Sequence, residues 1–261
     1  MKGRLVGKTV LVTRPVDQSR ELCQLLEAEG ARTIVQPAIE ILPPESWDEL
    51  DAAFQKIANR QVDWAVFSSS NGVRFAFDRL RAIGKDARSF FINTQTRVAS
   101  VGSSTAESLR EYGVTVDLVP RQFDADGLVD ALVERVGSPV GLTVVSFRAS
   151  RGRKTFAERL TSYGAKVIEI AVYRSVDVKT PQAEALKELQ AGRIDFATAT
   201  SSASARALCA MFGSETRKTR WIALSSLTGE ALLSQGVAVD SVANSTTMAG
   251  LVEAVVGANA Q

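Results

Sequence analysis

The sequence predicts an α/β protein with two equivalent halves, each containing a parallel β-sheet flanked by helices. Two observations carry this prediction: the chain repeats itself along most of its length, and short apolar runs alternate with helical patterns in each copy. A third observation is that glycines follow the predicted helices, where a left-handed backbone ends a helix without a steric penalty. These glycines are Gly30, Gly113, Gly164 and Gly236.

The internal repeat consists of three blocks whose offset decreases along the chain. Residues 9–14 resemble residues 143–148 at an offset of 134. The later blocks pair residues 63–70 with 195–202 at an offset of 132, and 98–129 with 221–252 at an offset of 123. Because the blocks keep their order, the second copy is a shortened version of the first.

Within the copies, strands are predicted where β-branched and apolar residues form short runs, and helices where apolar residues recur every three or four positions. The predicted strands include residues 10–12, 65–67, 98–101 and 144–147. The predicted helices include residues 17–29, 71–82, 104–112 and 127–136. With about five strands each, the halves have the size of flavodoxin-like lobes.

Two extended segments follow the second strand of each copy, at about residues 36–44 and 171–180. Pro43 and Pro44 end the first segment, and Pro181 directly follows the second. Because proline cannot donate to a strand ladder, we expect crossing linkers here rather than further sheet.

The composition narrows the function. The 261 residues carry a formal charge of +2, which disfavours nucleic-acid binding as the main activity. The absence of histidine excludes a Ser-His-Asp relay and a His-ligated zinc. Cys23 and Cys209 are expected to be buried reduced thiols. No apolar run has the length of a signal peptide core or a membrane span, so we expect a soluble cytoplasmic protein without membrane contacts.

Polar turns are predicted at the carboxyl ends of the strands, where ligands bind in open α/β sheets. The free N–H groups of the following helices favour anions, and arginines offer forked donors to carboxylate or phosphate. The candidate binding residues are Arg14, Ser68, Ser69, Ser70, Asn71, Gly102, Ser103, Thr105, Arg148, Arg151, Arg153, Thr200, Ser201, Ser202, Ser226 and Thr228.

Each candidate also has an ordinary structural interpretation. Serine and threonine are common helix N-caps, and Arg14 could pack its stem against the sheet and reach solvent. Tyr173 could be a half-buried strand aromatic. The glycine patterns of dinucleotide and P-loop sites are absent from the sequence, and no carboxylates have metal-ligand spacing. A site for a polyanionic small molecule between two lobes remains.

Together, the motifs resemble the uroporphyrinogen-III synthase family, from about residue 10 to residue 256. The motifs are residues 10–15, 68–73, 101–106, 148–153, 172–174 and 250–252. Ser68 stands where this family more often has threonine, and Ser225 and Ala149 stand where it has glycine.

The resemblance implies an enzyme that closes hydroxymethylbilane to uroporphyrinogen III, losing water and inverting the last ring through a spiro intermediate. It implies no metal and no organic cofactor, and Tyr173 matches a tyrosine that assists hydroxide departure. It also implies a two-stranded linker and a discontinuous first lobe, with residues 1–36 joining 175–261 and residues 39–173 forming the second lobe.

As partners, the resemblance implies the linear tetrapyrrole substrate, which carries eight carboxylates, and a monomeric enzyme that receives it from hydroxymethylbilane synthase. A different class of protein stays open at this point. A non-catalytic, two-lobed binding or regulatory protein for a polycarboxylate ligand would share every loop feature.

Overall fold

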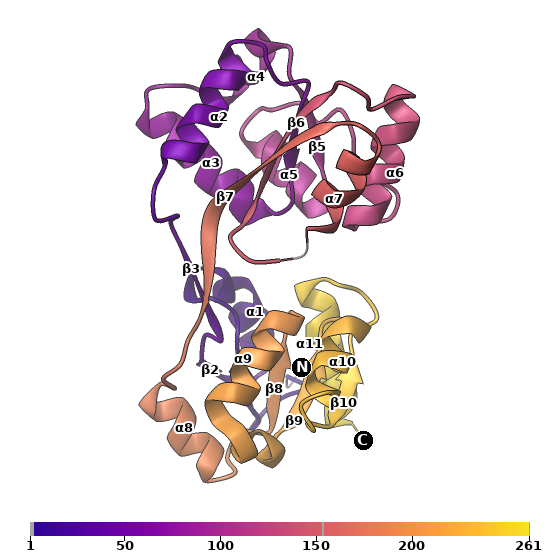
Figure 1. Cartoon of the computed structure of the whole chain (residues 1–261). Helices are drawn as coiled ribbons and strands as arrows, with labels where there is room; N and C mark the ends of the chain where they lie inside the picture. Colours follow the sequence, from indigo (N-terminus) through magenta and orange to yellow (C-terminus); the bar gives the residue numbers. More distant parts are fainter. Residues whose placement is uncertain (1–2, 153, 261) are drawn as a thin grey trace. The chain divides into compact units, whose positions relative to one another are not determined.

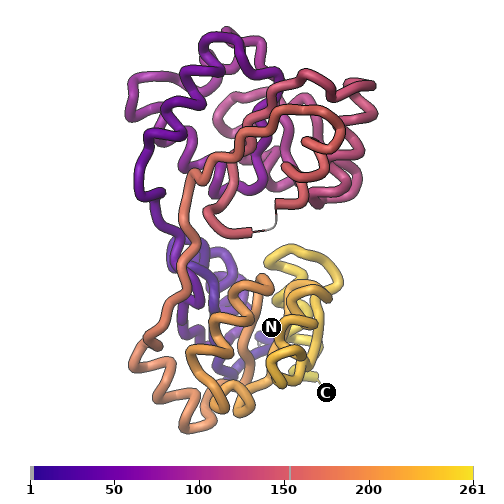
Figure 2. Tube along the Cα trace, viewed as in Figure 1, coloured from indigo at the N-terminus to yellow at the C-terminus, as the bar shows by residue number. Residues whose placement is uncertain are grey.

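The computed structural model describes residues 3–152 and 154–260. The chain divides into two compact units, which are described separately. Unit 1 comprises Met1–Ile41 and Val176–Gln261, and unit 2 comprises Leu42–Ser175. Figures 1 and 2 show the two passages of the chain from one unit to the other, in β3 (Ile39–Leu42) and near the end of β7 (Lys166–Asp177).

Unit 1 is a five-stranded sheet covered by helices on both faces (Figure 1). Its elements are β1 (Thr9–Val12), α1 (Val16–Ala28), β2 (Arg32–Val35), α8 (Ala183–Gln190), β8 (Phe196–Ala199), α9 (Ser202–Phe212), a 3₁₀ helix (Gly213–Lys218), β9 (Arg220–Ala223), α10 (Ser226–Leu233), β10 (Val239–Val242) and α11 (Met248–Asn259). The strand order is β10-β9-β8-β1-β2, with parallel pairing throughout. One apolar cluster joins the sheet to α8, α9 and α10, and a second joins it to α1 and α11.

Unit 2 is a second five-stranded sheet, in the order β3-β7-β6-β4-β5. Its remaining elements are α2 (Asp48–Ala58), β4 (Trp64–Phe67), α3 (Ser70–Ala82), α4 (Ala87–Thr94), β5 (Arg97–Ser100), α5 (Ser103–Glu111), α6 (Ala125–Val136), β6 (Thr143–Ala149) and α7 (Thr155–Ser162). Apolar side chains of α6 and α7 pack on one face. Phenylalanines of α2, α3 and α4 pack with those of β4 and β6, at centroid distances of 4.7–6.3 Å.

The sequence repeat is distributed over both units. The segment β1–α1–β2 of unit 1 corresponds to β6–α7–β7 of unit 2, whereas β8 and β9 of unit 1 correspond to β4 and β5 of unit 2. Each unit therefore combines the first part of one copy with the second part of the other. The strand orders agree over these four strands, so the carboxyl ends of equivalent strands carry equivalent loops.

Both extended segments pass between the units, but the expectation that they lie outside a sheet is wrong. β3 is the edge strand of the sheet in unit 2, and its neighbour β7 continues as one strand of 12 residues from Lys166 to Asp177. The pairing extends further, since the backbone N–H of Val178 donates to the carbonyl of Ala38 at 3.0 Å. An extended pair satisfies backbone groups that two separate crossings would leave to water.

The predictions about helix ends and element bounds are confirmed. Gly30, Gly113, Gly164 and Gly236 all have positive φ, between 73° and 89°, as expected past a helix end. The predicted strands and helices exist, with ends shifted by one or two residues. Cys23 and Cys209 are partly rather than fully buried free thiols, and this burial raises the pKa of both. No helix in the described part of the chain is long and apolar enough to span a membrane.

Candidate functional site

Tyr173 lies on β7 in unit 2, and its phenolic oxygen is 3.1 Å from the Oγ of Ser69. The Tyr173 ring stacks on Phe75 of α3, with centroids 5.8 Å apart and an angle of 15° between the planes. The side chain is buried, with 8% of its surface exposed. Strand β7 and the start of α3 therefore hold this phenol in one orientation, and only a small part of it can meet a ligand.

The three serines after β4 have structural partners. Ser69 is the N-cap of α3, because its Oγ accepts the backbone N–H of Gly72 at 3.1 Å. Ser68 donates its hydroxyl to the carbonyl of Phe147 at 3.2 Å, and Ser70 donates to the carbonyl of Ser104 at 3.3 Å. Asn71 is in the first turn of the same helix. The capping interpretation of this turn is thus correct for Ser69.

The turn after β5 is different because its helix has no side-chain cap. Gly102 is the N-cap residue of α5, and its backbone is extended, with φ −148°. Ser103 is exposed at the first helical position, while Thr105 is buried, with 4% exposure. The first N–H groups of α5 are therefore not occupied by a capping side chain, which is the arrangement that favours a bound anion.

The three candidate arginines after β6 are Arg148, Arg151 and Arg153, and those that the structure describes have different environments. The Arg148 guanidinium pairs with Glu169 of β7 at 3.2 Å and also donates to the carbonyl of Gly152 at 3.0 Å. Arg151 donates to the hydroxyl of Ser175 at 3.3 Å. Arg153 lies outside the described residues. The charge of Arg148 is already compensated within the sheet, which leaves less of it for a ligand.

In unit 1, Arg14 follows β1 and precedes α1, a helix without a side-chain cap. Its guanidinium contacts the Met248 sulfur at 3.1 Å and the Gln18 side-chain oxygen at 3.4 Å, and its buried Nε has no hydrogen-bond partner. Burial lowers the pKa of Arg14, against the opposing influence of Glu21 and Asp17. A half-buried cation to which no carboxylate of the described residues is bonded is a good receptor for an external carboxylate.

Two of the remaining candidates in unit 1, Ser201 and Ser202, make structural hydrogen bonds. Ser201 caps α9 through a reciprocal pair of hydrogen bonds with Ser204, and Ser202 donates to the carbonyl of Leu227 at 3.0 Å. Ser225 caps α10 by accepting the N–H of Thr228 at 3.3 Å.

Of the other three, Thr228 has only 1% of its surface exposed, so its side chain offers almost nothing to a ligand. Thr200 is half-buried and Ser226 is exposed. The hydroxyl-rich turns of unit 1 are thus occupied by structural hydrogen bonds, with Ser226 left at the surface.

The helix N-termini after the strands fall into two classes. Those of α3, α9, α10 and α11 are capped by Ser69, Ser201, Ser225 and Thr247. Those of α1, α2, α5, α7 and α8 have no side-chain cap. Three of these five, α1, α5 and α7, follow the turns that carry Arg14, Gly102 and Arg148, so anion binding is best supported at those three.

Several residues of these sites were not anticipated. Phe75 orients Tyr173, Glu169 compensates Arg148, and Phe123, which is 60% exposed, lies against Gly102. Glu169 could have been noticed as a lone acid in an apolar strand. Among the described residues, no group of three or more His, Cys, Asp or Glu could hold a metal ion.

Comparison with known proteins gives a consistent result. A family model described as uroporphyrinogen-III synthase HemD matches residues 20–253. The uroporphyrinogen-III synthase of Synechococcus elongatus is 33% identical over 212 residues, covering 80% of this chain and 76% of that protein. That of Chlorobaculum parvum is 30% identical over 236 residues, covering 89% and 92%.

Solved structures give the same fold at lower identity. A mutant uroporphyrinogen III synthase from Thermus thermophilus has a TM-score of 0.68 at 16% identity and covers 96% of this chain and 98% of that one. The uroporphyrinogen-III synthetase from Helicobacter pylori has a TM-score of 0.61 at 16% identity, with coverages of 96% and 99%.

Proposed function

The chain belongs to the uroporphyrinogen-III synthase family, and we propose that it acts as a cyclising hydro-lyase that converts hydroxymethylbilane to uroporphyrinogen III. The predicted turns supply binding groups, and Tyr173 supplies the proton for the leaving hydroxide. The observation that carries the catalytic part is the 3.1 Å contact between the Tyr173 phenol and the Ser69 hydroxyl.

Substrate binding is an electrostatic task, because hydroxymethylbilane carries eight carboxylates. Arg14 is suited to it, because its guanidinium is half-buried and bonded to no carboxylate among the described residues. The uncapped N-termini of α1, α5 and α7 add unoccupied N–H groups and the positive ends of helix dipoles. Exposed Ser103 of unit 2 and exposed Ser226 of unit 1 can each donate a hydroxyl hydrogen bond to a substrate carboxylate.

The first chemical step breaks the bond between the hydroxymethyl carbon and its oxygen. The pyrrole nitrogen supplies electron density, and the departing hydroxide takes a proton to become water, which leaves an azafulvene. Ser69 already accepts the Gly72 N–H, so its own hydrogen can be donated to the phenolic oxygen. In that arrangement the Tyr173 proton is directed away from Ser69 and is available to the hydroxide.

Ring closure then requires position rather than a nucleophile. The azafulvene carbon bonds to the substituted carbon of the last pyrrole, and the resulting spiro intermediate rearranges with inversion of that ring. Holding a flexible chain in the reactive fold can lower a barrier by roughly 7–11 kcal/mol in favourable cases. The fixed dipoles of the open helix N-termini would stabilise charge that develops in these steps.

The proposed partners follow from the reactivity of the substrate. Uncatalysed closure gives the uninverted type I isomer, so rapid transfer from hydroxymethylbilane synthase to a monomer of this chain would protect the yield. A catalyst would give the type III isomer, whereas a protein that only binds the substrate would leave the type I isomer.

The deciding experiment supplies freshly made hydroxymethylbilane to the purified chain and separates the uroporphyrinogen isomers. We expect the type III isomer in large excess over type I, whereas a protein-free control yields type I. Formation of the type I isomer alone would remove the catalytic proposal, and it would support the binding-protein alternative if the chain also binds the substrate. Running the same assay on Tyr173→Phe separates the role of the phenol from the role of the fold.

A further inference from the structure

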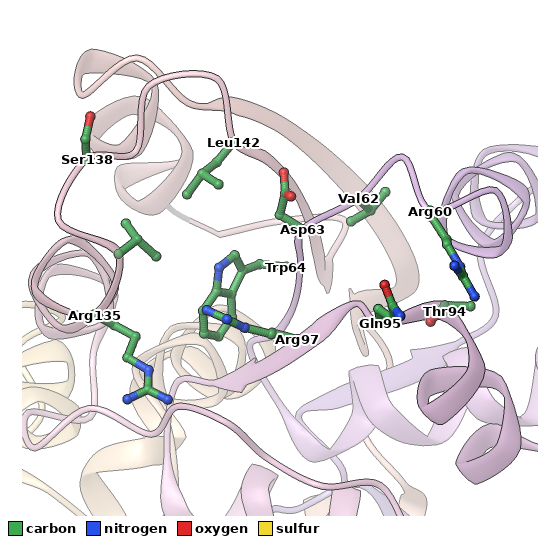
Figure 3. Close-up of a pocket in the computed structure, with 11 residues that line it drawn as sticks. Arg60, Val62, Asp63, Trp64, Thr94, Gln95, Arg97, Arg135, Ser138 and Leu142 are labelled. Carbon is green, nitrogen blue, oxygen red and sulfur yellow. The ribbon is translucent and has the colours of Figure 1, made fainter.

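A pocket of about 470 Å³ lies in unit 2 at the amino ends of β4 and β5 (Figure 3). Its lining includes Trp64 and Arg97, the first residues of these strands, and Arg60, Gln95 and Arg135 from the ends of α2, α4 and α6. The proposed catalytic turns follow the carboxyl ends of the strands, so the pocket lies at the opposite, amino-terminal end of the sheet. Its volume is in the range of small-molecule sites.

The pocket is rich in cations that lack acidic partners. Arg60, Arg97 and Arg135 are all exposed, and none of them forms an ion pair with a residue that the structure describes. The Arg97 guanidinium lies over the Trp64 ring, 5.7 Å from its centroid. The acid in the lining is Asp63, and one of its oxygens already accepts the backbone N–H of Thr143 at 2.8 Å.

The internal repeat allows a comparison of this pocket with the equivalent position in unit 1. There, the arginine at the amino end of the strand is paired with an acid. Arg220 is the counterpart of Arg97, and it donates twice to Asp240, at 2.9 and 2.7 Å. The counterpart of Asp240 is Asp117, whose carboxylate instead accepts the N–H of Val98 at 2.8 Å. The arginine at this position of the repeat is therefore paired with an acid in unit 1, whereas in unit 2 it has no acidic partner among the described residues.

The other two arginines have no counterpart in unit 1. By the offsets of the repeat, Gly192 stands where unit 2 has Arg60, and Ala258 stands where it has Arg135. Unit 2 therefore carries two more arginines than unit 1 at these positions. A fold does not require these charges, since the equivalent unit forms without them.

Backbone strain is concentrated at the same pocket. In the part of the chain that the structure describes, Arg60 and Gln95 are the two non-glycine residues with positive φ, at 56° and 62°, and both line this pocket. Gly192, the counterpart of Arg60, has φ 65°, so this helix end is one that glycine fits. Keeping an arginine there has a conformational cost, and such outliers tend to gather at functional sites.

We propose that this pocket binds a small molecule with two or more oxyanion groups, such as a polycarboxylate or a polyphosphate. Arg60, Arg97 and Arg135 would supply forked donors, and the side-chain amide of Gln95 would supply a further one. Multiple anionic groups are needed because the arginines come from three different elements around the pocket (Figure 3).

The test is calorimetric titration of the full chain at constant ionic strength, with citrate as the polycarboxylate and pyrophosphate as the polyphosphate. The informative variants, Arg60→Gly and Arg135→Ala, install the residues of unit 1. Glycine suits the left-handed backbone at position 60, and alanine is a strong helix former, so both variants are expected to fold. Arg206→Gln, an exposed arginine of α9 in unit 1, controls for loss of one charge.

We expect saturable binding of at least one probe, weakened at least about tenfold by each pocket variant and abolished by both together. Arg206→Gln should bind as the parent chain does. The probe that binds more tightly identifies whether carboxylate or phosphate is the natural chemistry. Absence of saturable binding, or equal affinity in the double variant, would overturn the proposal without bearing on isomer synthesis.

Discussion

The phenolic oxygen of Tyr173 lies 3.1 Å from the Oγ of Ser69, so strand β7 and the N-terminus of α3 share one hydrogen bond. If the phenol protonates the departing hydroxide, Tyr173→Phe should lower kcat by about 100-fold, the lower range for general acid catalysis. The stacking on Phe75 remains in this variant, so the fold should persist. Turnover of hydroxymethylbilane to the type III isomer measures the effect, and unchanged turnover would contradict the role.

Ser69→Ala serves as the companion variant. It keeps the phenol but removes the cap of α3, which should cost about 1 kcal/mol of unfolding free energy. Because the Tyr173 phenol is still present, kcat should fall less than in Tyr173→Phe. Equal losses of kcat in both variants would indicate that the pair acts through positioning alone.

Gly102 and Ser225 occupy equivalent positions, yet only Ser225 caps its helix. Gly102→Ser should close the open N-terminus of α5 and raise KM several-fold. Its new Cβ would meet the Phe123 side chain at 3.7 Å, an ordinary contact, so unfolding free energy should rise by about 0.3 kcal/mol. Steady-state kinetics and chemical unfolding test both parts, and an unchanged KM would exclude this helix end from substrate binding.

How far the sequence predicts this structure depends on the range of each interaction. The left-handed glycines and the serine caps follow from residues within one turn, and they were predictable. The contact of Arg148 with Glu169 depends on the register of β6 and β7, in which Arg148 is opposite Ala171. No local pattern specifies that register, so the ion pair of Arg148 with Glu169 cannot be predicted from the sequence.

Two further contacts, those of Phe75 with Tyr173 and of β3 with β7, also depend on the tertiary fold. Stacking of Phe75 on Tyr173 depends on how α3 packs against β7, which is a tertiary relationship. The pairing of β3 with β7 brings together segments about 130 residues apart, and the prolines near its ends suggest segments outside the sheet instead. Strand pairing at such separations is set by the whole fold rather than by local propensity.

Arg14 and Arg148 should respond differently to the same substitution. Arg14 has no carboxylate partner among the residues that the structure describes, so Arg14→Gln should raise KM at least about tenfold with little change in stability. Arg148→Gln leaves Glu169 without its cation and should lower the unfolding free energy by about 1–2 kcal/mol. Kinetics and denaturant unfolding of both variants check this contrast. A large stability loss in Arg14→Gln would show that its contacts are structural.

The ion pair between Asp51 of α2 and Arg79 of α3 predicts a pH-dependent stability. The Arg79 Nε donates to the Asp51 carboxylate at 2.8 Å, and this bond holds the pKa of Asp51 below its ordinary value of 3.8, against the opposing effect of burial. A depressed folded pKa contributes stability that is present above the unfolded pKa and is lost as pH falls through the folded value. Asp51→Asn should therefore cost about 1 kcal/mol at pH 7, the upper range for a partly exposed pair, and the difference should shrink below pH 3.8. Urea unfolding from pH 7 to pH 3 measures it, with Glu45→Gln as a control, because Glu45 is 83% exposed and should have almost no effect. A difference that persists undiminished to pH 3 would contradict the linkage.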